Sequence, residues 1–134
     1  MAEKLRIGII GCGGIAHAHA RSYLNFDDVE IVAGADIIPG KARKFLDEFG
    51  LSGATAYESH EELCKRDDID AVSVCTYNST HAVCTIAALE SGKIGGYATD
   101  VVEGEPIGAD HVLLGTRNVI VTPHLGGYSV VSLR

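Results

Sequence analysis

The chain has 134 residues, which is the size of one ordinary domain. Its hydrophobic fraction of 46% and charged fraction of 22% are typical of a globular protein and argue against disorder. The net charge of −7 disfavours a nucleic-acid-binding surface, because phosphate backbones select basic faces. The longest apolar runs are too short to cross a bilayer, so we expect no membrane association.

The amino terminus and the cysteines indicate the compartment. The first residues lead directly into an apolar strand-like segment without the long apolar region of a secretory signal, which predicts a cytoplasmic protein. Cysteines stay reduced in that compartment, and here they lie far apart with no CxxC pair. Their spacing predicts no metal site. The four are Cys12, Cys64, Cys75 and Cys84.

Strand-like and helix-like segments alternate in chain order, which is the pattern of a parallel sheet covered by helices on both faces. We expect strands at residues 5–10, 29–35, 54–57, 71–75, 97–102 and 119–122. Helices follow the first four strands, and a helix-poor crossover joins the last two. With right-handed crossovers, this order predicts a doubly wound, mainly parallel six-stranded sheet of Rossmann type. We expect one domain over residues 1–134, with no separate substrate domain.

Several residues mark where the helices begin and end. Pro39 suits the first turn of the second helix, and Gly50 suits the left-handed residue that follows its end. Ser59 opens a capping box for a short third helix. Ser79 or Thr80 can cap the fourth helix.

A glycine-rich turn follows the first strand and carries the sharpest functional signal. In the pattern GxGxxA, Gly11 permits a tight turn, Gly13 lets a pyrophosphate approach the backbone, and Ala16 keeps the helix close to the sheet. Asp36 ends the second strand 20 residues after Ala16, where a carboxylate would accept hydrogen bonds from the hydroxyls of an adenosine ribose. We therefore predict a dinucleotide site that includes Gly11, Cys12, Gly13, Gly14, Ile15, Ala16, Asp36 and Ile37.

The acidic residue also favours NAD over NADP, because a carboxylate repels the 2′-phosphate of NADP. Lys41 and Arg43 follow closely behind Asp36, so NADP stays the less favoured alternative. Two other interpretations compete with NAD binding. The glycines could form only a tight turn, or the site could bind S-adenosylmethionine, which uses a similar turn and acidic residue.

Residues 4–92 resemble the cofactor domain of the glucose–fructose oxidoreductase and inositol dehydrogenase family. The resemblance rests on RIGIIGCGGIA at residues 6–16, on Asp36 and on DAVSVCTYNSTH at residues 70–81. It implies that Asn78 and His81 lie beside the nicotinamide, and we add Thr76 to the cofactor site. The family's next strand should end in Glu-Lys-Pro, whose lysine binds substrate, and this chain lacks that motif.

Residues 88–127 resemble the end of the cofactor domain of the D-isomer-specific 2-hydroxyacid dehydrogenases. The match covers ALESGKIGGYATDVVEGEP from residue 88 and NVIVTPHLGG from residue 118. It implies that Asp100 helps to hold the nicotinamide, that His124 is the general acid/base and that Glu105 orients it. The partner arginine of that family is missing here.

The segment ALESGK fits both families, so we place a seam near residues 88–94 and hypothesise a natural or engineered chimera. A single divergent lineage is the alternative. The first functional hypothesis is an NAD-dependent oxidoreductase that transfers hydride to or from a hydroxy acid, keto acid or polyol, using His124 and Glu105. The second is a cofactor-binding module without turnover, since neither the family lysine nor the arginine is present. A homodimer could supply the cleft that a missing lobe leaves open.

Overall fold

The structure is a computed structural model that describes residues 3–92, 96–99, 105–111, 114 and 119–121. The chain divides into two compact units, residues 1–94 and residues 95–134, which are described separately. The predicted domain over residues 1–134 stays a prediction.

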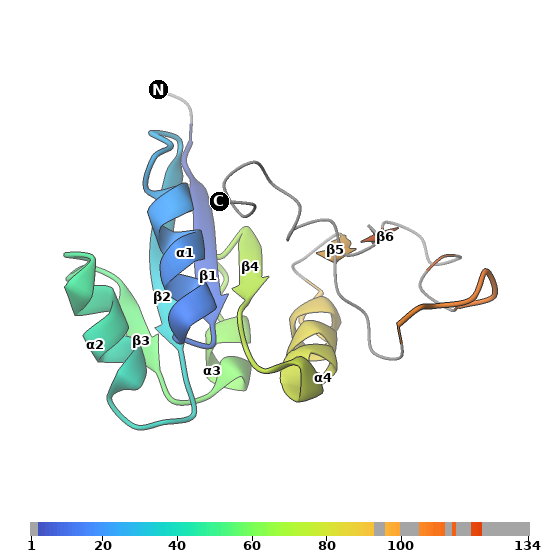
Figure 1. The fold of residues 1–134 in the computed structure, drawn as a ribbon. Helices are drawn as coiled ribbons and strands as arrows, with labels where there is room; N and C mark the ends of the chain where they lie inside the picture. The colour runs from blue at the N-terminus through green and yellow to red at the C-terminus, as the bar shows by residue number, and fades with distance from the viewer. Residues whose placement is uncertain (1–2, 93–95, 100–104, 112–113, 115–118, 122–134) are drawn as a thin grey trace, which may run out of the picture. The chain divides into compact units, whose positions relative to one another are not determined.

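The first unit alternates strands and helices (Figure 1). Its elements are β1 (Leu5–Ile10), α1 (Gly14–Tyr23), β2 (Val29–Ala35), α2 (Lys41–Glu48), β3 (Thr55–Tyr57), α3 (His60–Cys64), β4 (Ala71–Val74) and α4 (Asn78–Glu90). Its four strands form one parallel sheet in the order β3-β2-β1-β4. All four strands therefore end at the same edge of the sheet.

The second unit contains β5 (Tyr97–Thr99) and β6 (Val119–Val121), which pair in parallel. The parallel α/β fold of Rossmann type is confirmed, and six strands form at the expected places. They belong to a four-stranded and a two-stranded sheet, however, where the sequence predicted one sheet of six. The predicted ends of β5 and β6, at residues 100–102 and 122, lie outside the described residues.

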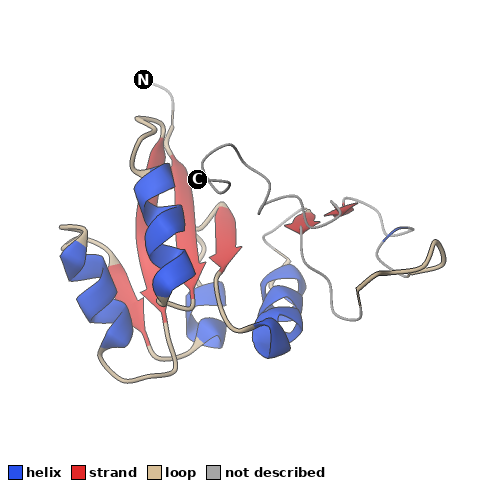
Figure 2. Cartoon of the chain, in the orientation of Figure 1, coloured by secondary structure: helices blue, strands red, loops and turns tan. Residues whose placement is uncertain are grey.

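Helices cover both faces of the four-stranded sheet (Figure 2). Successive side chains of a strand point to opposite faces, and here both faces carry apolar side chains that need covering. Ile7 and Ile9 of β1 pack in one buried cluster with residues of α1 and α2, including Phe45. Ile10 faces the other side and joins a second cluster with Leu63 of α3 and Cys84 of α4. Each large side chain that is fully buried this way contributes about 1.5–3 kcal/mol to folding.

The helix ends confirm some of the expected caps and correct others. Gly50 has φ of +68° just after the end of α2, and the hydroxyl of Ser59 accepts the backbone N–H of Glu61, as a cap should. Pro39 does not lie in the first turn of α2, because the left-handed Gly40 intervenes as the N-cap.

The start of α4 was also predicted wrongly. The helix begins at Asn78, with Tyr77 as its extended N-cap residue, so neither Ser79 nor Thr80 is the cap. The hydroxyl of Thr80 lies inside the first turn and donates a hydrogen bond of 3.0 Å to the carbonyl of Tyr77. A serine or threonine within the first turn can thus resemble a cap in the sequence.

The cysteines and the helices also bear on metal and membrane association. All four cysteines are free thiols. Across the part of the chain that the structure describes, no helix is long and apolar enough to span a bilayer. Within the same residues, no three side chains of the metal-binding types come together.

Candidate functional site

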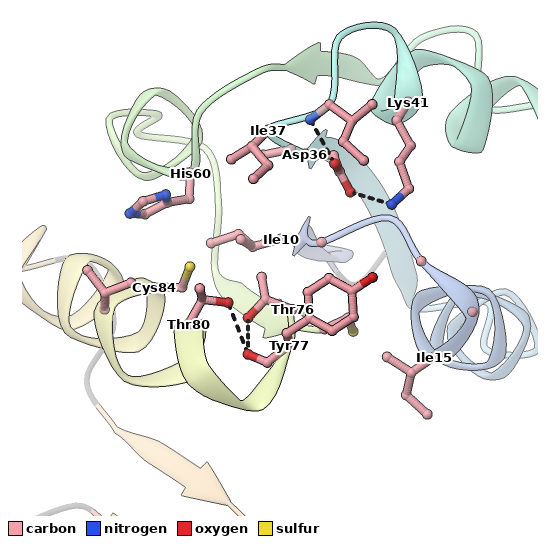
Figure 3. A pocket seen from close by; sticks show the side chains of 17 residues that line it. Ile10, Ile15, Asp36, Ile37, Lys41, His60, Thr76, Tyr77, Thr80 and Cys84 are labelled. Carbon is pink, nitrogen blue, oxygen red and sulfur yellow. Dashed lines mark hydrogen bonds and ion pairs between the residues drawn. The ribbon is translucent and has the colours of Figure 1, made fainter. Parts of the chain in front are cut away.

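A cavity of about 390 Å³ lies at the edge of the sheet where β1, β2 and β4 end (Figure 3). Parallel strands bring their following turns together at this edge, which explains why residues distant in sequence share the cavity. The lining is mainly apolar, with one carboxylate and one ammonium among the described residues. It comprises Ile10, Gly11, Gly13, Gly14, Ile15, Ala35, Asp36, Ile37, Ile38, Lys41, His60, Cys75, Thr76, Tyr77, Thr80, Val83 and Cys84.

The β1–α1 turn, residues 11–13, uses its two cavity-lining glycines differently. Gly11 has φ of +86°, and a Cβ there would lie 2.8 Å from the backbone of Cys75 and Thr76. Only glycine fits at this position. Gly13 has no atom within 4 Å of an added Cβ, so a side chain would project into open space beside the cavity. Gly11 therefore shapes the turn, whereas Gly13 keeps space free.

Helix α1 begins at this turn and directs its amino terminus at the cavity. Gly13 is its extended N-cap and provides no side-chain cap, so backbone N–H groups of the first turn are available to a ligand. The first turn carries no acidic side chain that would compete for them. Ala16 is completely buried against the sheet, where a larger side chain would push the helix away. Such a helix end favours an anion.

Asp36 directly follows β2 and faces the β1–α1 turn. Its Oδ2 atom accepts the backbone N–H of Cys12 at 2.9 Å, and its Oδ1 atom accepts the N–H of Ile38 at 2.9 Å. The ammonium of Lys41 lies 3.3 Å from Oδ2. Burial alone would raise the pKa of Asp36, but these three donors outweigh it and lower the pKa. Asp36 is therefore a carboxylate at neutral pH.

Seven of the predicted site residues line this cavity together. They are Gly11, Gly13, Gly14, Ile15, Asp36, Ile37 and Thr76. Two others lie behind it: Ala16 supports the helix, and Cys12 is buried with its thiol 3.5 Å from the carbonyl of Ala35. Burial raises the pKa of Cys12 to about 12, so this thiol is protonated at neutral pH.

Asn78 and His81, the other predicted residues of the first unit, are not among the described residues that line the cavity. His81 donates from Nε2 to the carbonyl of Thr76 at 2.7 Å and so braces the start of α4. Asn78 opens that helix. Asp100 and His124 lie outside the described residues, and Glu105 is an exposed residue of the second unit. The predicted pairing of Glu105 with His124 therefore stays a prediction.

Sequence reasoning left His60 and Ile38 out of the site, and it gave Lys41 only as a residue near Asp36. All three line the cavity. Each follows the end of a parallel strand, which is the signal that could have found them, because the ends of β2 and β3 meet at one edge.

Residues 5–108 match the GFO/IDH/MocA family model, described as an oxidoreductase family with an NAD-binding Rossmann fold. The match runs through residues 88–94. An inositol 2-dehydrogenase/D-chiro-inositol 3-dehydrogenase of Lactiplantibacillus plantarum is 37% identical over 93 residues, which are 69% of this chain and 26% of that protein. The chain thus spans about a quarter of the length of this curated relative.

Solved structures share the fold. A mutant 3-ketoreductase from Actinomadura kijaniata, in complex with TDP-benzene and NADP, is 31% identical with a TM-score of 0.62. The alignment covers 69% of this chain and 29% of that one. A myo-inositol dehydrogenase from Lactobacillus casei, in complex with NAD(H) and myo-inositol, is 23% identical with a TM-score of 0.69. That alignment covers 95% of this chain and 38% of the other, and it bears on the fold alone.

Proposed function

This chain belongs to the GFO/IDH/MocA oxidoreductase family and provides its NAD-binding Rossmann domain, and we propose that the cavity at the ends of β1, β2 and β4 is where the dinucleotide binds. One observation carries the proposal: the open backbone at Gly13 and the carboxylate of Asp36 line the same cavity. A pyrophosphate needs backbone that it can approach closely, and an adenosine ribose needs a carboxylate that accepts hydrogen bonds from its hydroxyls.

The residues present fit this cofactor. The first-turn N–H groups of α1 can donate to the pyrophosphate, and the absence of side chains at Gly13 and Gly14 lets it come close. Asp36 can accept a hydrogen bond from a ribose hydroxyl. Its two oxygens offer about four lone-pair directions, and the three donors present here use three of them. When bound, the cofactor supplies the group that accepts or donates hydride.

We propose that NAD is preferred to NADP. The support is electrostatic: Asp36 is ionised, and its side chain is only 8% exposed, so water screens its charge poorly. A 2′-phosphate beside it would be repelled. Members of this fold are known with either cofactor, as the two structures above illustrate.

For the whole reaction, we propose hydride transfer to or from a polyol, as the names of the inositol dehydrogenase relatives suggest. His124 is the proposed proton donor and acceptor, Glu105 the residue that orients it, and the expected homodimer stays a prediction. The alternative is a module that binds the dinucleotide without turnover. Assay of the chain with NAD and myo-inositol separates them, because the module binds NAD but forms no NADH.

The chimeric origin of residues 88–127 also stays a proposal. It is supported by the quoted sequence of these residues and by the boundary between compact units after residue 94, whereas the family model continues to residue 108. Replacing residues 95–134 with the counterpart from an inositol dehydrogenase should preserve cooperative unfolding. Loss of cooperativity would count against a neutral seam.

Calorimetric titration of the purified 134-residue chain tests the proposed cofactor. NADH, NADPH and S-adenosylmethionine are compared at one salt concentration. We expect one-to-one binding of NADH, weaker binding of NADPH and no binding of S-adenosylmethionine. A dinucleotide at 100 times its dissociation constant should add about 2.7 kcal/mol of stability, which a melting experiment detects. If neither dinucleotide binds, the glycine turn is only a structural feature.

A further inference from the structure

Two of the cationic residues of α2, Arg43 and Lys41, have different roles in the structure. The guanidinium of Arg43 donates to Asp47 at 2.9 Å and to the carbonyls of Ala54 and Leu51 at 2.8 and 3.1 Å. These bonds hold the chain between α2 and β3, so Arg43 is committed to structure. Lys41 instead lines the cavity.

Lys41 is the displaceable partner of Asp36. The other two donors, the N–H groups of Cys12 and Ile38, are fixed in the backbone. Lys41 contacts Oδ2 at 3.3 Å from a flexible side chain that is 35% exposed. A ribose whose hydroxyls donate hydrogen bonds to Asp36 therefore competes with Lys41 and not with the two amides. The displaced ammonium stays tethered beside the ribose, because α2 begins at Lys41.

We propose that Lys41 is a specificity-determining residue that contacts the 2′-phosphate when NADP occupies this site, so that the chain accepts both dinucleotides. The inference rests on the proposed function, because it requires the adenosine ribose to lie at Asp36. Asp36 favours NAD, and Lys41 offsets the repulsion that Asp36 exerts on a 2′-phosphate. The ratio of the two affinities is set by this pair of opposite charges.

The test compares Lys41→Met with Lys44→Met by calorimetric titration of NADH and NADPH. Lys44 lies on the same helix, is exposed and does not line the cavity, so its variant has the same net charge without the local change. Removing a cation from the first turn of a helix does not destabilise it, so we expect Lys41→Met to fold. Melting temperatures check this, and Lys41→Arg retains the charge.

We expect Lys41→Met to weaken NADPH binding about tenfold and to change NADH binding less than about threefold. Lys44→Met should leave both affinities within about twofold, and Lys41→Arg should largely restore NADPH binding. The inference is overturned if the ratio of the NADH and NADPH affinities is the same in Lys41→Met as in the unmodified chain. It is also overturned if the unmodified chain binds NADH but not NADPH. Failure of the unmodified chain to bind either dinucleotide instead refutes the proposed function, and the inference with it.

Discussion

The β1–α1 turn (residues 11–13) and the β2–α2 turn (residues 36–40) border the same cavity but bring different chemistry to it. The first offers a glycine backbone and the amino terminus of α1. The second begins with the carboxylate of Asp36, and the ammonium of Lys41, the first residue of α2, lies 3.3 Å from it. Neutral backbone groups recognise what all dinucleotides share, whereas the charged pair can recognise the position where they differ. We therefore expect changes in the first turn to affect all dinucleotide binding and changes in the second to affect the choice of cofactor.

The largest effect should come from Gly11→Ala, which tests the structural part of the first turn. The new Cβ would meet the backbone of Cys75 at 2.8 Å in a left-handed conformation, and the backbone there cannot move as a flexible side chain could. We expect a loss of about 3 kcal/mol in the free energy of unfolding. Denaturant titration measures it, with Gly53→Ala, which meets no neighbouring atom, as the control. Equal stabilities would refute the close approach.

Gly13→Val should separate folding from binding in the same turn. The valine side chain meets no atom of the protein within 4 Å at its Cβ, and the backbone at φ −92° and ψ −161° is one that valine adopts readily. Its methyl groups would occupy the space proposed for the pyrophosphate. We expect affinity for NADH and NADPH to fall about 100-fold, or about 2.7 kcal/mol, with little loss of stability. Unchanged affinities in calorimetry would exclude Gly13 from the binding site.

Asp36→Asn should change cofactor choice and preserve the β2–α2 turn. The amide oxygen can still accept a backbone N–H, but the negative charge is gone. We expect NADH affinity to fall about tenfold, because a charged hydrogen bond is worth more than a neutral one, and NADPH affinity to be maintained or to rise. Parallel titrations with both cofactors measure the ratio. If both affinities stay as they were, the ribose does not lie at Asp36.

The smallest effect concerns His17 of α1, which connects the β1–α1 turn to the end of α2. Its Nδ1 donates to the carbonyl of Gly13 at 2.7 Å and its Nε2 to Glu48 of α2 at 2.8 Å. Both hydrogen bonds raise the pKa of His17, and the bond to the Gly13 carbonyl has the larger effect. This stabilisation is complete below the unfolded pKa of about 6.5 and is lost as pH rises through the raised folded value. His17→Gln should cost about 0.5 kcal/mol more at pH 6 than at pH 9, by urea unfolding.

His19 provides the opposite control two residues further along α1. Burial lowers its pKa, and its Nδ1 lies 2.9 Å from the hydroxyl of Ser73. The neutral form is the stabilising one, so its contribution is complete above pH about 6.5 and is lost as pH falls below that value. His19→Gln should therefore cost more stability at pH 9 than at pH 6. The same pH trend in both variants would contradict the assigned pKa directions.

The sequence predicted the β1–α1 turn and Asp36 well because their geometry follows from local rules. A left-handed Gly11, a buried Ala16 and a carboxylate at the end of β2 are each marked by residue type and spacing. The cavity-facing position of Lys41 and His60 is not local, since it depends on how two turns from neighbouring strands meet. The start of α4 was missed because two hydroxyl residues follow its true N-cap, Tyr77.

Amide chemical-shift mapping by NMR tests whether the β1–α1 turn and Asp36 bind one dinucleotide. NADH is added to the isotope-labelled 134-residue chain, and each backbone N–H is followed. We expect the largest changes at residues 11–16 and 36–38, with Gly53 and the other remote amides unaffected. Changes confined to other residues, or none at saturating NADH, would contradict it.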